Sequence, residues 1–131
     1  MRDEPQARLD ELIERLRERN YRITPQRLAI LDILEVFVYQ QLVDTYGNVP
    51  YTEALGGVDN STPVYDDAAT IYADLFTRIT ADINQLSANA SDGSFGAEDV
   101  FFGGDVDMWI KAAGSLKLRM AMRLADVDAS T

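Results

Sequence analysis

Two tyrosines at the ends of one irregular segment have the residue type and position that suit ligand binding. Tyr51 and Tyr65 flank a stretch that contains proline, glycine and asparagine. Their flat rings could stack on the apolar face of a sugar, although the favoured alternative is that each hydroxyl anchors the segment to a helix. Trp109 lies on a regular apolar stripe, which favours a place in the core. Tyr51 and Tyr65 are therefore the candidate ligand-binding residues.

The composition excludes most catalytic chemistry. The chain has no cysteine and no histidine, which rules out thiol nucleophiles, cysteine-ligated zinc, iron–sulfur clusters and histidine-dependent catalysis or metal binding. Its 22 acidic residues include enough carboxylates for glycoside hydrolysis, but no spacing singles out a pair. We therefore predict that the protein is not an enzyme and has no catalytic residue and no cofactor.

An acidic group precedes the last predicted helix and has the oxygen ligands that calcium prefers. It consists of Glu98, Asp99, Asp105 and Asp107. The spacing of these residues does not fit the twelve-residue calcium-binding loop, and it favours helix capping and solvated charge instead. No metal site is predicted.

Charge is distributed unevenly over the 131 residues, which carry a net charge of −10. Residues 1–31 have seven arginines against six acids, and residues 32–131 have five basic against sixteen acidic side chains. Because an acidic surface repels phosphate backbones, nucleic acid is an unfavourable partner for most of the chain. The arginines of residues 1–31 could contact phosphate. Their helical spacing from acidic residues favours the alternative, which is ion pairs within a helix.

Membrane and export signals are not visible in the sequence. No apolar run reaches the roughly 18 residues that a membrane-spanning helix needs. The charged start, Met1–Pro5, lacks the apolar region of a signal peptide, and no cysteine is available for lipid attachment. From these features we expect the chain as written to stay in the cytoplasm.

Apolar periodicity predicts two helices in the first part of the chain. Leu9, Leu12, Ile13 and Leu16 follow helical spacing, which predicts a short amphipathic helix over residues 6–19. Thr24-Pro25 is a typical helix start and Gly47 a typical stop, so a second helix is expected over 25–46. Its predicted inward stripe is Leu28, Leu31, Leu34, Val38, Leu42 and Tyr46, although residues 30–39 are apolar nearly all round.

Two further helices and two long connections complete the expected architecture. Residues 48–65 lack a period, and a third helix follows Asp66 and Asp67. Its inward face is predicted to contain Ala68, Ile71, Leu75, Ile79, Asp82 or Ile83, and Leu86. After a polar linker, a fourth helix is expected from Asp105 onward with the stripe Trp109, Ala113, Leu116, Met120, Leu124 and Val127. We predict a single all-α domain over residues 1–131, a helical bundle with two long irregular loops.

The beginning of this bundle resembles the ferric uptake regulator (Fur) family of winged-helix repressors. The resemblance covers about residues 9–34 and is most specific at residues 16–27, which read LRERNYRITPQR. It implies a DNA-binding regulator. The recognition helix and wing that read DNA are missing, however, and the metal sites of that family depend on histidine and cysteine, which this chain lacks.

The remainder, about residues 33–128, resembles an internal part of the SusD/RagB family of glycan-binding outer-membrane proteins. Three blocks carry the resemblance: YQQLVDTYGNVPYTEAL at 39–55, TPVYD at 62–66, and GDVDMWIK at 104–111 running on to SLKLRMAMRL at 115–124. The resemblance implies tetratricopeptide-like helix packing, a lipoprotein at the outer membrane, a TonB-dependent transporter as partner, and glycan capture for nutrient uptake. Those proteins are several times longer, so this chain is expected to be an incomplete scaffold.

Both resemblances together suggest a chimera, with a Fur-like segment over 1–32 joined to a SusD-like segment over 33–131 inside the second helix. The leading prediction is a non-enzymatic binding or scaffold module related to glycan uptake, and the alternative is a Fur-type regulator. The chimera hypothesis predicts an unbroken helix over 25–46, with Val38 and Leu42 buried against residues 71–79 and 109–124. Apolar surface left exposed would favour self-association.

Overall fold

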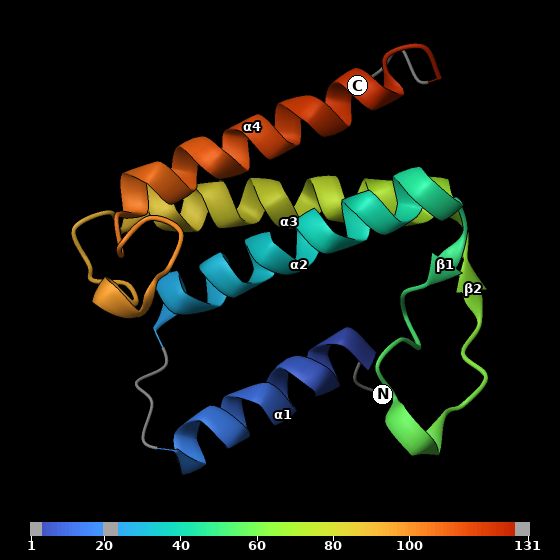
Figure 1. Ribbon diagram of the computed structural model, residues 1–131, viewed down its shortest axis with the longest axis horizontal. Helices are drawn as coiled ribbons and strands as arrows, with labels where there is room; N and C mark the ends of the chain where they lie inside the picture. Colours follow the sequence, from blue (N-terminus) through green and yellow to red (C-terminus); the bar gives the residue numbers. More distant parts are fainter. Residues whose placement is uncertain (1–3, 20–23, 128–131) are drawn as a thin grey trace.

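The computed structural model describes residues 4–19 and 24–127, which form a helical protein (Figure 1). The helices of this part are α1 (Glu4–Glu18), α2 (Pro25–Tyr46), α3 (Ala68–Ala88) and α4 (Val106–Leu124). The short strands β1 (Val49–Pro50) and β2 (Tyr65–Asp66) pair antiparallel in the first long connection, where no strand was expected. The predicted all-α class is confirmed, as is the unbroken helix over residues 25–46.

The ends of α2 follow directly from its sequence. The Thr24 hydroxyl oxygen accepts a hydrogen bond of 3.3 Å from the backbone N–H of Arg27, and Pro25 occupies the first turn, where its missing N–H costs no hydrogen bond. At the other end, Gly47 has a φ of 76° and donates its N–H to the Val43 carbonyl at 2.8 Å. Both predicted boundaries are confirmed.

Helix α3 packs against both α2 and α4, and these two contact each other much less (Figure 1). The buried apolar side chains of α3 and α4 are Ile71, Tyr72, Leu75, Ile79, Leu86, Val106, Trp109, Ala113, Leu116 and Met120. Most of the predicted stripe residues of both helices are among them; Ala68, Ile83 and Leu124 are partly buried against the core, and Val127 is exposed. A single apolar face on each helix explains why periodicity identified it.

The predicted inward stripe of α2 is wrong. Val38 is 52% exposed and Leu42 is 36% exposed, so neither is buried against α3 or α4. The side chains of α2 in the core are instead Ala29, Ile30, Ile33, Val36, Tyr39 and Val43. Because α2 is apolar nearly all round, several stripes fit helical spacing equally well, and contact with α3 selects among them. The core also draws on Ala29 and Ile30, which precede the predicted junction.

Helix α1 contributes no described side chain to the core. Its exposed face has the ion pairs that the spacing predicted: Arg15 pairs with Glu11 at 2.6 Å, and Arg17 pairs with Glu14 at 3.0 Å. Pairs this exposed contribute little to stability. These two arginines are therefore paired with acids of the same helix. A phosphate-binding surface would instead need their guanidinium groups to be available.

The second long connection is organised around Asp99, which is buried. Its carboxylate accepts hydrogen bonds from the backbone N–H groups of Phe101, Phe102 and Gly104 at 2.9–3.1 Å and from the Trp109 indole N–H at 2.6 Å. Although burial would raise the Asp99 pKa, these hydrogen bonds lower it below its ordinary value. The connection is thereby fixed to the first turns of α4.

Gly104 is required in this connection because it contacts the backbone of Gly96. Its φ is +86°, and a Cβ atom would lie 2.6 Å from the Gly96 Cα and 2.7 Å from the Gly96 nitrogen. We therefore expect Gly104→Ala to lower the free energy of unfolding by about 2 kcal/mol, measured by urea denaturation. Gly93→Ala is the matched control, since a Cβ there meets nothing within 4 Å. Equal stability of the two variants would contradict the proposed backbone contact.

Candidate functional site

The segment between α2 and α3 holds both candidate tyrosines, and acidic side chains determine its path. The Asp66 carboxylate accepts hydrogen bonds from the backbone N–H groups of Tyr51 and Thr52, both at 2.8 Å. Slight burial would raise the Asp66 pKa, but these bonds and the Thr52 hydroxyl lower it. The Glu53 carboxylate accepts from the Val64 N–H at 3.1 Å across the loop. The segment is thus an ordered two-stranded loop that projects from the helices (Figure 1).

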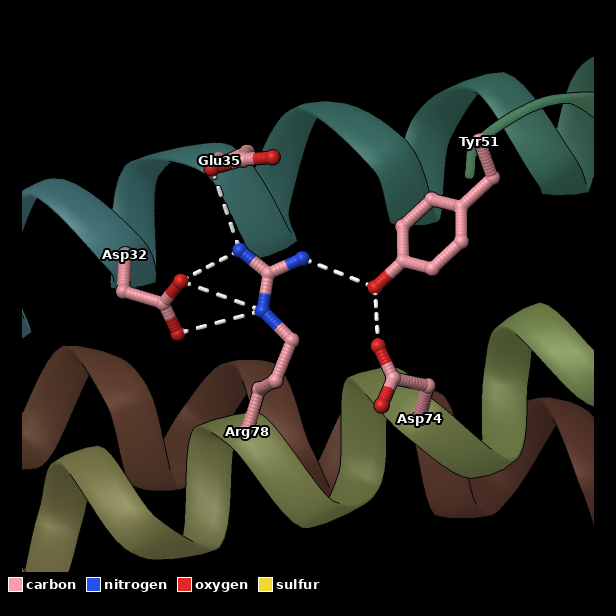
Figure 2. Close-up of polar contacts among 5 residues, drawn as sticks. All are labelled: Asp32, Glu35, Tyr51, Asp74 and Arg78. Carbon is pink, nitrogen blue, oxygen red and sulfur yellow. Dashed lines mark hydrogen bonds and ion pairs between the residues drawn. The ribbon is translucent and has the colours of Figure 1, made fainter. Parts of the chain in front are cut away.

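Tyr51 lies in the interior and connects this loop to the helices. It is only 8% exposed, and its ring meets that of Tyr39 edge-on at 4.8 Å between centroids. Its hydroxyl donates to Asp74 and accepts from Arg78 Nη1 at 2.8 Å (Figure 2). Burial, followed by the hydrogen bond to Asp74, raises the Tyr51 pKa well above its ordinary value, so the phenol keeps its proton. This is the anchoring role that the sequence favoured for the hydroxyl.

Arg78 is the centre of a polar network between α3 and α2. Its guanidinium forms a bidentate ion pair with Asp32 and lies 3.1 Å from Glu35 (Figure 2). Burial would lower the Arg78 pKa, but the hydrogen bonds and charge of Asp32 raise it above its ordinary value. The guanidinium therefore stays charged and links two helices to the loop through Tyr51.

Asp82 lies one helical turn beyond Arg78 and is buried. Burial, followed by a hydrogen bond with Asp32 and the charge of Asp32, raises its pKa from 3.8 to about 9. One of its oxygens, Oδ2, has no hydrogen-bond partner among the described residues. At neutral pH Asp82 therefore keeps its proton and donates a hydrogen bond to Asp32.

A second network joins the ends of α2, α3 and α4. Asp44 accepts hydrogen bonds from the Tyr72 hydroxyl and the Gln40 amide, and it pairs with Arg123 Nε at 3.2 Å. Burial and the bond to Asp44 raise the pKa of Tyr72 to about 12. Like the Arg78 network, this arrangement holds helices together and leaves its phenol protonated at neutral pH.

The structure does not bring the two candidate tyrosines together as one binding surface. Tyr51 is enclosed by the helices, whereas Tyr65 is 71% exposed on β2, opposite Pro50. Trp109 is 3% exposed, in the core as expected. Tyr65 is thus the candidate whose ring is accessible to a ligand.

The acidic group before α4 has structural contacts. Asp99 organises the preceding loop, and Asp105 caps α4 by accepting a hydrogen bond from the Met108 N–H at 3.2 Å. Within residues 4–19 and 24–127, no three acidic side chains lie close enough together to hold a metal ion. In the same range, no helix is long and apolar enough to cross a membrane.

The Arg78 network was not predicted from the sequence. Asp32 and Arg78 are 46 residues apart, and no local pattern reports a contact over that separation. The sequence did contain one indication of a buried polar network. Asp82 falls on the predicted apolar face of α3, and a buried acid needs a polar partner.

Comparisons with known proteins agree with this fold. Residues 4–131 match the model of the SusD-like family, described as starch-binding and associating with the outer membrane. No curated protein matches the chain. A solved SusD homologue from Bacteroides uniformis is similar, with 30% sequence identity and a TM-score of 0.76 over 93% of this chain and 24% of that one. The chain spans about a quarter of that protein's length. With nearly all of its residues matched, this protein belongs to the SusD-like family.

Proposed function

We propose that this chain is a non-enzymatic glycan-binding module of a SusD-like protein that takes part in nutrient uptake at the outer membrane. The observation that carries the proposal is the family match over residues 4–131, whose description names starch binding and the outer membrane. The proposed partner is a TonB-dependent transporter.

The proposed contact for the glycan is the ring of Tyr65. Asp66, the residue after Tyr65, is held in place by the hydrogen bonds that Tyr51 and Thr52 donate to it. The exposed Tyr65 ring is therefore presented on an ordered strand. A ring that is already positioned loses little conformational entropy on binding. Tyr51 supports the same loop from beneath through Asp74 and Arg78.

Tyr65→Ala tests this contact. We expect the affinity for maltooligosaccharides, measured by isothermal titration calorimetry, to fall about tenfold, the equivalent of about 1.4 kcal/mol. Tyr46→Ala is the matched control, because Tyr46 is also exposed but lies at the end of α2. No binding by the unmodified chain would refute the proposed function, and equal effects of both substitutions would refute the role of Tyr65.

The Fur-type alternative and the chimera stay predictions. The family match begins at residue 4 and therefore includes the segment that resembles Fur. A mobility-shift assay at low salt, run beside an affinity gel containing starch, separates the two functions. Retardation by DNA without retardation by starch would favour the regulator.

A further inference from the structure

A half-open apolar groove lies between α2 and α4, at the end where the loop before α4 covers them. Its volume is about 560 Å³, within the range of small-molecule sites. Its walls are formed mainly by Leu34, Phe37, Phe101, Phe102, Trp109 and Leu116. The groove exists because α2 and α4 each pack against α3 and contact each other little.

The aromatic side of the groove is held in place. The Trp109 ring meets the rings of Phe102 at 4.9 Å and Phe101 at 5.9 Å, both in edge-on geometry. The Trp109 indole N–H is bonded to Asp99, and the ring is only 3% exposed, so it supports the more exposed Phe101 ring from the core side. The Ser115 hydroxyl donates to the Lys111 carbonyl at 2.9 Å. These walls therefore suit an alkyl chain, since a sugar would leave its hydroxyl groups without partners.

Arg119 adds a positive charge to the groove. Its guanidinium lies 5.4 Å from the centroid of the Phe37 ring, and no carboxylate of the described residues pairs with it. Arg78 and Arg123, by contrast, both form ion pairs with acids. In a chain with a net charge of −10, an arginine without an acidic partner beside an apolar groove is complementary to an anionic group.

We propose that this groove binds an amphiphilic carboxylate, with the alkyl chain against Phe37 and Phe101 and the carboxylate on Arg119. Burial of the alkyl chain provides affinity, and the charge-assisted hydrogen bonds to the guanidinium provide selectivity for the anionic head group. The site is separate from Tyr65 and does not depend on glycan binding.

Trp109 is a direct probe, because it is the only tryptophan in the chain. We expect decanoate, added below its micelle-forming concentration, to change the Trp109 fluorescence saturably. Decanol and decyltrimethylammonium should bind at least about tenfold more weakly, because neither can form the charge-assisted hydrogen bonds that a carboxylate forms with the Arg119 guanidinium. Arg119→Gln should weaken decanoate about tenfold and leave decanol unchanged.

A matched pair of substitutions on α4 tests the location. Ala112 lines the groove and Ala121 lines a shallow depression between α3 and α4, so Ala112→Leu should abolish decanoate binding and Ala121→Leu should not. Decanoate binding that survives Ala112→Leu, or equal affinity for decanoate and decanol, would overturn the proposal. A dimer in sedimentation experiments that covers Phe37 and Phe101 and excludes the ligand would also overturn it. Starch retardation by the Ala112→Leu variant remains unchanged if the two sites are independent.

Discussion

Replacing Arg78 by alanine is expected to lower the free energy of unfolding by about 3 kcal/mol, the largest loss for a single side chain in the polar network. The substitution leaves the Asp32 carboxylate without its cation in a partly buried position and removes the hydrogen bond that Tyr51 accepts. Tyr51 thereby loses one of its two hydrogen bonds to α3 and keeps the one to Asp74. Urea denaturation followed by circular dichroism measures the loss.

Two further variants test whether the loss of stability comes from a buried charge left without its partner. The double variant Asp32→Asn/Arg78→Met removes both charges of the buried pair and should recover part of the stability, because the carboxylate left without its cation is then only that of the more exposed Glu35. Arg119→Ala is the control at an exposed arginine and should change stability by less than about 0.5 kcal/mol. A loss below about 1 kcal/mol for Arg78→Ala would mean that the pair behaves like an exposed one.

Asp82→Asn is expected to make the stability of the protein depend much less on pH. The pKa of Asp82 is about 9 in the folded chain, against an ordinary value of 3.8. Between these values the folded chain holds one proton more than the unfolded chain, so this group makes the free energy of unfolding fall as pH rises. The free energy of unfolding of the unmodified chain is therefore expected to fall steadily, by a few kcal/mol, between about pH 5 and pH 8.

An asparagine at position 82 cannot titrate, and its amide can still donate to Asp32. Denaturant unfolding at several pH values should therefore show the slope in the unmodified chain and not in the variant. Asp66 and Asp99 act only at the acid end, since their lowered pKa values stabilise the fold above about pH 4 and the effect is lost as pH falls further. Asp59→Asn, at an exposed loop position, serves as the control. If the free energy of unfolding depended on pH in the same way in Asp82→Asn and Asp59→Asn, the proton assigned to Asp82 would be contradicted.

Helices α3 and α4 and both ends of α2 were predictable because the information is local. Each of the first two has one apolar stripe, and Thr24, Asp105 and Gly47 satisfy the backbone groups at helix ends within a few residues. The face of α2 was not predictable in the same way. Its central residues are apolar nearly all round, so the burial of Val36 and the exposure of Val38 depend on where α3 lies.

For the candidate site too, the sequence predicted the local features and not the contacts between distant residues. The sequence was sufficient to identify an irregular segment flanked by Tyr51 and Tyr65, because turn residues and aromatic side chains are visible in it. It was not sufficient to distinguish the two tyrosines, since one is enclosed and the other exposed only after the loop packs on the helices. The partners of Arg78 come from α2 and from the loop beyond it, and the groove at Trp109 forms between helices that touch α3 on either side. Such features depend on contacts between distant residues, and these form only when the chain folds.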